Sequence, residues 1–193
     1  MKEMNVVIVG LYTYFNVPVR ILHPLADRLE GVKAHTIFYK NYDSNLFSLP
    51  TEKEEKLFLD NIIKINPKVV AISLLSPYVL IAKRITELVK KHTEAVVVWG
   101  GVGPTITPEE HIKMTDVICI GEGERAFEEL ILAVRDKKDY SNIKNLWVNK
   151  ETEVIKNPQG PLIQELDTLP FAVYGKENMY FIEQNKCTTE DPE

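Results

Sequence analysis

The sequence is poor in cysteine, in long apolar runs and in net positive charge. Its 193 residues include only two cysteines, Cys119 in an apolar run and Cys187 in a polar stretch, which are too few for a disulfide framework or a cysteine-based metal cluster. No run of about 18 apolar residues is present, and the first residues lack the layout of a signal peptide. We therefore expect a cytoplasmic protein with free thiols and no membrane partner.

The charge balance argues against polyanionic partners. The formal net charge is −5 at pH 7, and a net acidic surface does not attract nucleic acid or anionic lipid. The four histidines show no metal-ligand spacing, and they are His23, His35, His92 and His111. No nucleophile–base pair and no phosphate-binding P-loop can be named. The sequence predicts no catalytic residue and no metal ligand.

Short β-branched runs alternate with amphipathic stretches, which is typical of βαβ units around a parallel sheet. Strands are predicted at residues 5–9, 33–38, 69–73, 95–99 and 117–120. Helices are predicted at residues 17–29, 51–66, 76–91, 107–114 and 124–135. The second strand is the least apolar and is expected nearer a sheet edge. The fold class expected is α/β, a doubly wound Rossmann-like or flavodoxin-like sheet of five parallel strands.

Local signals refine the predicted helix boundaries. Capping signals predict helix starts at Thr51, which has Glu54 three residues later, at Ser76 and at Thr107. Pro24 must lie in the first turn of its helix or kink it, because proline lacks the N–H that a helix interior needs.

The pattern changes after residue 138. Residues 145–149 and 153–156 flank a polar turn and predict an antiparallel hairpin. The chain is then rich in proline, with a Leu-Asp-Thr-Leu-Pro motif at 166–170, and its last residues show no helical period. We predict a domain at 1–138, a hairpin and linker at 139–175, and a tail at 176–193 that leads to a further domain.

In open α/β sheets, ligands bind beyond the carboxyl ends of the strands, so the loops at these ends carry the candidate site. The loop after the first strand contains Tyr12, Thr13 and Tyr14. The tyrosine rings either contact a ligand or pack on the first helix. The third strand ends in Ser73, Leu74, Leu75 and Ser76. The fourth is followed by Gly100, Gly101, Val102, Gly103, Pro104 and Thr105. Three glycines in four positions carry an entropic cost that folding alone rarely requires, and they predict a close ligand.

The loop after the fifth strand reads Gly121, Glu122, Gly123, Glu124 and then Arg-Ala, which formally matches the dinucleotide fingerprint G-x-G-x-x-A. That fingerprint presents a helix N-terminus to pyrophosphate. Two carboxylates would instead face the negative charge of the phosphates, and they suit hydroxyl, amide N–H or cationic partners. Nucleotide binding is therefore the weaker alternative.

These motifs, taken in order, resemble the cobalamin-binding N-terminal domain of cobalamin-dependent radical S-adenosylmethionine enzymes, a group of methyltransferases and Mg-protoporphyrin monomethyl ester cyclase-like proteins. Residues 67–73 resemble its third strand, and residues 100–110 resemble its glycine loop. Residues 116–124 resemble its Asp-then-Gly-Glu-Gly-Glu signature, and residues 166–170 resemble the passage out of this domain. The resemblance covers most of the chain.

The resemblance implies that Ser73, Leu74 and Leu75, followed by Gly100 and Gly101, line the nucleotide tail of cobalamin. It further implies that Glu122 accepts hydrogen bonds from amide or ribose donors, and that the loop at 12–15 faces the corrin. The D-x-H-x-x-G element that supplies a histidine to cobalt in methionine synthase-like domains is missing, so cobalt is expected to be bound base-off without a histidine ligand.

A C-x-x-x-C-x-x-C motif is also missing. The resemblance therefore places S-adenosylmethionine and the [4Fe–4S] cluster in a C-terminal radical domain, to which this domain would present cobalamin for methyl transfer or related radical chemistry. Two alternatives stay open, a cofactor-free interaction module of the same fold and a nucleotide-binding domain.

Overall fold

The structure, a computed structural model, describes residues 3–41, 48–150, 152–175 and 177–192. Its central parallel strands are β1 (Met4–Leu11), β2 (Val32–Tyr39), β3 (Val69–Ser73), β4 (Val96–Gly100) and β5 (Val117–Cys119). The interiors of these strands are apolar and buried because helices cover both faces of the sheet. The α/β class and the five predicted parallel strands are confirmed.

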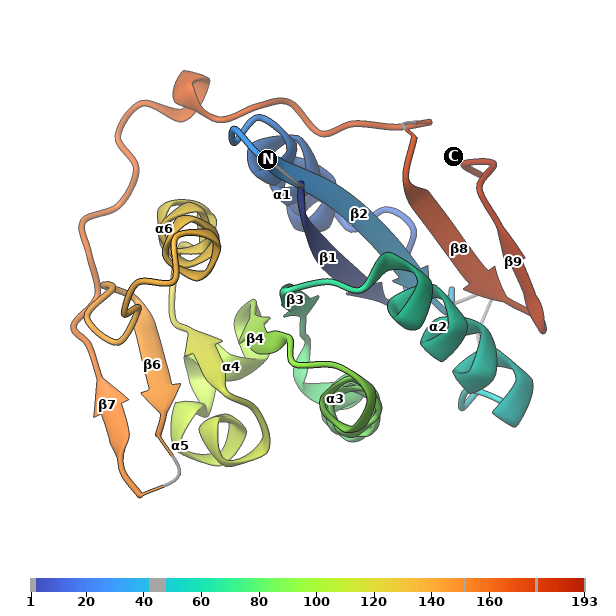
Figure 1. Ribbon diagram of the computed structural model, residues 1–193, viewed down its shortest axis with the longest axis horizontal. Helices are drawn as coiled ribbons and strands as arrows, with labels where there is room; N and C mark the ends of the chain where they lie inside the picture. Colours follow the sequence, from blue (N-terminus) through green and yellow to red (C-terminus); the bar gives the residue numbers. More distant parts are fainter. Residues whose placement is uncertain (1–2, 42–47, 151, 176, 193) are drawn as a thin grey trace.

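The helices form two layers (Figure 1). The layer over one face holds α1 (Val17–Asp27) and α6 (Glu124–Arg135), and the layer over the other holds α2 (Glu52–Ile65) and α3 (Val79–His92). Short helical segments complete the connections: η1 (Ser76–Tyr78), α4 (Val102–Ile106), α5 (Pro108–His111) and η2 (Ile112–Met114). Among the described residues, no helix is both long and apolar enough to span a membrane.

The strand order places a topological switch point between β1 and β3. The sheet runs β7-β6-β5-β4-β3-β1-β2-β8-β9, so the chain leaves β1 toward β2 and returns on the other side to β3. Ligand crevices in open α/β sheets lie at such a point, beyond the carboxyl ends of the strands.

The sheet has nine strands, not the five predicted. The hairpin of β6 (Leu146–Asn149) and β7 (Val154–Lys156) was predicted, and it joins the sheet antiparallel to β5. At the opposite edge, β8 (Met179–Glu183) pairs parallel with β2, and β9 (Lys186–Thr188) pairs antiparallel with β8. The expected irregular tail is thus wrong for these two strands. As predicted, β2 lies nearer a sheet edge than β1, β3 and β4, and the pairing with β8 covers it.

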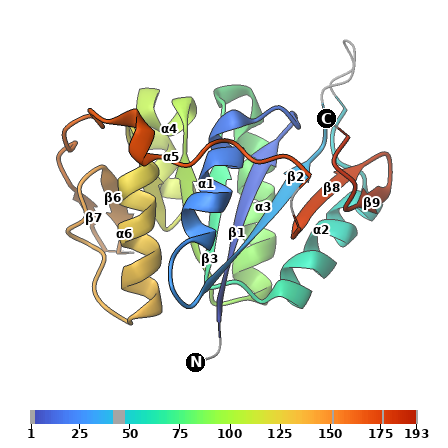
Figure 2. The same ribbon diagram turned by 90° about the horizontal axis from the view of Figure 1, so that it is seen from above.

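Residues 157–175, here called the strap, run from β7 to β8 across α6 and α1 and contain the turn η3 (Leu166–Thr168) (Figures 1 and 2). Pro24 lies inside α1 and not in its first turn. Because Pro24 has no N–H, it cannot donate to the carbonyl of Arg20 four residues earlier. Val173 N of the strap donates to this carbonyl instead, at 3.2 Å. The carbonyl of Arg20, which Pro24 leaves without its helical donor, is therefore an attachment point for the strap.

One of the three predicted caps forms. Glu54 N donates to Thr51 Oγ1 at 3.2 Å, and Thr51 N donates to Glu54 Oε2 at 2.9 Å, so the capping box of α2 is confirmed. Ser76 instead begins η1, and α3 starts at Val79 without a side-chain cap. Thr107 stands at the N-cap position of α5 without a side-chain cap, because its hydroxyl lies 3.0 Å from His111 Nδ1 and 3.5 Å from the carbonyl of Gly103 and not on a free backbone N–H.

Candidate functional site

Small residues occupy the carboxyl ends of the strands at the switch point. Gly10 lies in register with Ser73, and Ser73 lies in register with Gly100. Residues two apart on a strand share a face. Ala71 and Val98 belong to the core cluster beneath α1 and α6, so the row Gly10–Ser73–Gly100 faces the same layer. The row itself carries little side-chain bulk. The Phe38 ring nevertheless packs over Gly10, where it lies 3.1 Å from the position of a Cβ, and Asn16 lies over Ser73, so the space beside Gly100 is the least filled.

The three glycines between residues 100 and 103 differ in whether contacts within the chain require a glycine at that position. Gly101 has φ +99°, and a Cβ there would lie 3.0 Å from the carbonyl oxygen of Leu74. A Cβ on Gly103 would lie 3.3 Å from the same oxygen. The chain itself therefore requires two of the glycines that the sequence attributed to a ligand. A Cβ on Gly100 would meet nothing closer than Cys119 Cβ at 3.8 Å, so no packing contact explains that glycine.

Hydrogen bonds bring the loops after β3, β4 and β5 together. Leu74 N donates to Gly100 O at 2.8 Å, and Gly103 N donates to Leu74 O at 3.1 Å. Thr105 Oγ1 donates to Gly101 O at 2.9 Å and accepts from Gly121 N at 3.1 Å. Pro104 is buried, whereas Val102, Leu75 and Ser76 are exposed around this unit. Part of the predicted glycine loop is the short helix α4.

The two carboxylates of residues 121–124, here called the cofactor loop, are in different states. Glu122 Oε2 accepts a hydrogen bond from Ile163 N of the strap at 2.7 Å. Glu124 Oε2 is buried and has no hydrogen-bond partner among the described residues. Burial and the charge of Glu124 raise the pKa of Cys119, beside Gly100, to about 12. Glu124 is thus the available acceptor, whereas the sequence favoured Glu122.

The tyrosines after β1 are core residues. Tyr12 is buried, its ring stacks on Tyr78 at 4.6 Å, and its hydroxyl donates to Ser48 O at 2.9 Å. Tyr14 is buried on the other face of the sheet, in an edge-on contact with Phe181. Packing on the first helix, the alternative left open by the sequence, is right for Tyr14, which lies in the cluster beneath α1, and wrong for Tyr12, which lies in the cluster beneath α2 and α3. Thr13 is half-buried at the surface of this loop.

Asn16 was missed by the sequence reasoning. Its Oδ1 accepts from Val19 N at 3.3 Å as the N-cap of α1, and its Nδ2 lies 3.4 Å from Ser73 Oγ. An asparagine just before an apolar helix with a proline in its first turn is a cap signal that could have found it. Asn16 therefore stands across the switch point from Ser73.

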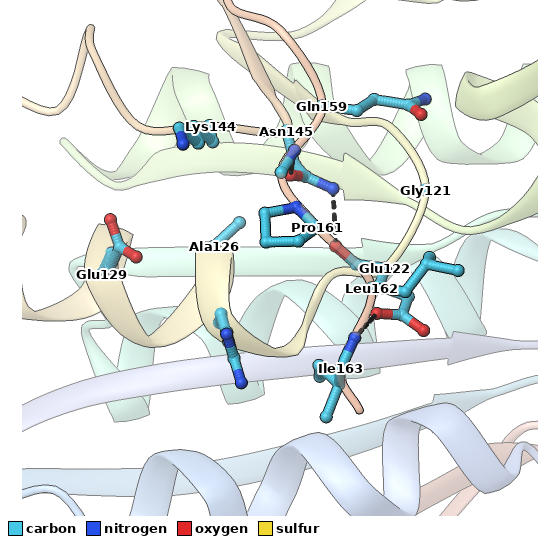
Figure 3. A pocket seen from close by; sticks show the side chains of 12 residues that line it. Gly121, Glu122, Ala126, Glu129, Lys144, Asn145, Gln159, Pro161, Leu162 and Ile163 are labelled. Atoms are coloured by element: carbon cyan, nitrogen blue, oxygen red, sulfur yellow. Dashed lines mark hydrogen bonds between the residues drawn. The ribbon is translucent and has the colours of Figure 1, made fainter. Parts of the chain in front are cut away.

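A pocket of about 280 Å³ lies beside the cofactor loop, between the first turns of α6 and the strap (Figure 3). Its lining includes Glu122, Arg125, Asn145, Gln159 and Ile163. Gly123, at the N-terminus of α6, is half-buried behind it.

The histidines lie away from the loop after β1. His23 Nδ1 pairs with Thr36 Oγ1 at 2.8 Å beneath α1, and His111 packs against Trp99. Within residues 3–41, 48–150, 152–175 and 177–192, no group of three metal-ligating side chains is assembled.

Comparisons with known proteins agree with this architecture. The model of the B12 binding domain family matches residues 21–131. An uncharacterized methyltransferase of Pyrococcus horikoshii is 33% identical over 117 residues, which are 58% of this chain and 25% of that protein.

Solved structures with the same fold include two cobalamin-dependent enzymes. TsrM of Kitasatospora setae, a radical S-adenosylmethionine methyltransferase with cobalamin and a [4Fe–4S] cluster bound, has a TM-score of 0.64 at 18% identity, over 89% of this chain and 31% of that chain. OxsB, a radical enzyme with aqua-cobalamin and S-adenosylmethionine bound, has a TM-score of 0.67 at 17% identity, over 83% and 23% of the two chains. The matched regions span between 23% and 31% of the length of these proteins. Because the family model covers more than half of the sequence, the chain belongs to the B12-binding domain family.

Proposed function

We propose that this domain binds cobalamin, with the nucleotide tail entering between the sheet and the layer of α1 and α6, and presents the corrin to a separate radical S-adenosylmethionine domain. The observation that carries the proposal is Gly100. It is the glycine of its loop that no contact within the chain requires, and it continues the row of small residues at the switch point. A narrow ligand there would remove the need for a side chain.

The residues present fit such a ligand. Ser73, Leu74, Gly100 and Gly101 would line the tail, and Thr13, Leu75, Val102 and Thr105 would border the corrin. The carboxylate of Glu124, one oxygen of which is buried without a partner, would accept a hydrogen bond from an amide of the corrin rim. When bound, cobalamin would supply cobalt-centred methyl-transfer or radical chemistry. The residues of this chain bind and orient it, and the radical domain would follow β9 in the full-length protein.

The test is retention of hydroxocobalamin. Purified protein is mixed with an excess, passed through a gel-filtration column, and its visible spectrum is recorded. We expect corrin absorbance to elute with the protein, to persist for Gly100→Ala, and to fall markedly for Gly100→Val, because branched carbons at this position would fill the groove and exclude the nucleotide tail. Far-ultraviolet circular dichroism of both variants should match the parent. A folded parent protein that carries no corrin would instead support a cofactor-free interaction module.

We also propose that cobalt takes no histidine ligand from this chain. Residues 12–16 of the loop after β1 contain no histidine, and the side chain of His23 pairs with Thr36 inside the fold. The electron paramagnetic resonance spectrum of protein-bound cob(II)alamin is therefore expected to be base-off and to lack nitrogen superhyperfine splitting. Such a splitting, if abolished by His23→Gln or His111→Gln, would contradict this assignment.

A further inference from the structure

Hydrogen bonds of Asn145 and Glu122 link the cofactor loop to the start of the strap, and Figure 3 draws the two that involve Glu122. Asn145 Nδ2 donates to Ile120 O at 2.8 Å and to Glu122 O at 3.1 Å, so it fixes the backbone of the cofactor loop. Asn145 Oδ1 accepts from Gly160 N at 2.7 Å, and Glu122 Oε2 accepts from Ile163 N at 2.7 Å. We call Glu122, Asn145, Gly160 and Ile163 the latch.

The local backbone is shaped around Asn145. Its φ is +68°, a left-handed conformation that asparagine tolerates better than most residues. A Cβ on Gly160 would lie 3.0 Å from Asn145 Oδ1, so glycine is required for the strap to come this close. Asn145 N also donates to Pro158 O at 3.1 Å. The amide of one side chain is thus shared between two segments that β6 and β7 separate in sequence.

We propose that Asn145 is a positioning residue for the cofactor loop and that the latch couples this loop to the strap, so that order in one segment stabilises the other. Glu122 is held by its backbone to Asn145 and by its carboxylate to the strap, and Glu124 lies two residues further along the same loop. A ligand that hydrogen-bonds to Glu124 would stiffen the loop and tighten the latch. Ligand binding would thereby also order the strap, which leads toward β8.

Amide hydrogen exchange in the ligand-free protein tests this coupling. Asn145→Asp keeps the acceptor for Gly160 N and the tolerance of positive φ, but it loses both donors to the loop. We expect it to speed exchange of the Ile163 amide, which Asn145 does not contact, by about tenfold, a loss comparable to one hydrogen bond. Conversely, Glu122→Ala should speed exchange of the Gly160 amide, whose acceptor is Asn145.

Glu129→Gln is the matched control, because Glu129 lines the same pocket and takes no part in the latch. It should leave both amides unchanged. Two results would overturn the coupling. If each latch substitution affects only the amide that it contacts directly, the contacts are independent. If it affects the amides of β1, β3 and β4 equally, the substitution destabilises the whole protein.

A second arm uses hydroxocobalamin and rests on the proposed function. The ligand should slow exchange of the Gly160 and Ile163 amides, and Asn145→Asp should weaken its binding by about tenfold. Faster Ile163 exchange on ligand addition would overturn the coupling, because the ligand would then take Glu122 from the strap. If the parent protein binds no corrin, the proposed function fails, while the ligand-free arm still decides the latch.

Discussion

At the scale of single residues, Glu124 is expected to contribute to ligand binding and not to the stability of the ligand-free protein. One of its oxygens is buried without a partner, and leaving an acceptor unpaired costs roughly 1–3 kcal/mol. We predict that Glu124→Gln weakens hydroxocobalamin binding by about tenfold while the melting temperature of the ligand-free protein stays the same or rises. Titration of the corrin absorbance gives the affinity. An unchanged affinity would show that Glu124 contacts no ligand donor.

His35 predicts an acid-sensitive stability. It is buried, and neither ring nitrogen has a hydrogen-bond partner among the residues that the structure describes. Burial, with a smaller effect of the Lys33 charge, lowers its pKa from 6.5 to about 4. Between these values the unfolded chain binds a proton that the folded chain does not, so stability is full above pH 6.5 and falls as the pH drops toward 4.

The expected loss through His35 is about 2 kcal/mol at about pH 5 relative to about pH 7. Urea unfolding of the parent and of His35→Phe across this range measures it. The substituted protein should show a flatter dependence of the free energy of unfolding on pH. Parallel curves for the two proteins would exclude His35 as the titrating group.

At the scale of elements, the junction of β4 and α4 separates glycines needed for folding from the one available to a ligand. Gly101→Ala forces a Cβ against Leu74 O at a positive φ and should cost about 1–3 kcal/mol of unfolding free energy. Gly100→Ala meets only an ordinary contact and should change it by less than about 0.5 kcal/mol. Chemical unfolding of the two variants checks the contrast, and equal losses would refute it.

The same elements show what the sequence could predict. The capping box of α2 was predictable because Thr51 and Glu54 are neighbours in sequence. The missing side-chain cap at Thr107 was not, because its hydroxyl lies against His111 Nδ1 and the carbonyl of Gly103, and α4 itself is held by the distant Leu74 backbone. Strand β8 was not predicted, because it is short and its partner β2 lies far away in the sequence, so no local pattern indicates the pairing.

The site was predictable to the same extent. Ser73 and Gly100 follow from the ends of strands, and the switch point places them side by side. The division of roles between Glu122 and Glu124 depends on Ile163, which reaches the cofactor loop from a proline-rich stretch without periodicity. The latch residue Asn145 carries no sequence signal beyond its position ahead of a hairpin strand.

At the scale of the whole molecule, Arg20 fastens the C-terminal strands to the body. Its buried guanidinium bonds both oxygens of Asp191, at 2.8 and 3.0 Å, and lies over the rings of Phe38 and Tyr174. Breaking a buried pair by removing one charge typically costs about 3–5 kcal/mol. We predict a loss of this order in unfolding free energy for Asp191→Asn.

The matched control for Asp191→Asn is Glu190→Gln, an exposed neighbour whose substitution should change stability by less than about 0.5 kcal/mol. Chemical unfolding of both variants gives the comparison. Similar stabilities would mean that β8 and β9 are a loosely attached extension, whereas the predicted gap makes them part of one cooperative domain.

In the proposed binding mode, the nucleotide tail of cobalamin lies over Ser73 and Gly100 at the carboxyl ends of β3 and β4. The most direct measurement compares the calorimetric affinities of hydroxocobalamin and of cobinamide, which lacks the tail, for the parent protein and Gly100→Val. The account predicts that the parent prefers hydroxocobalamin by at least about tenfold, and that Gly100→Val removes this preference while cobinamide binding is retained. Equal affinities of the parent for the two corrinoids would contradict it.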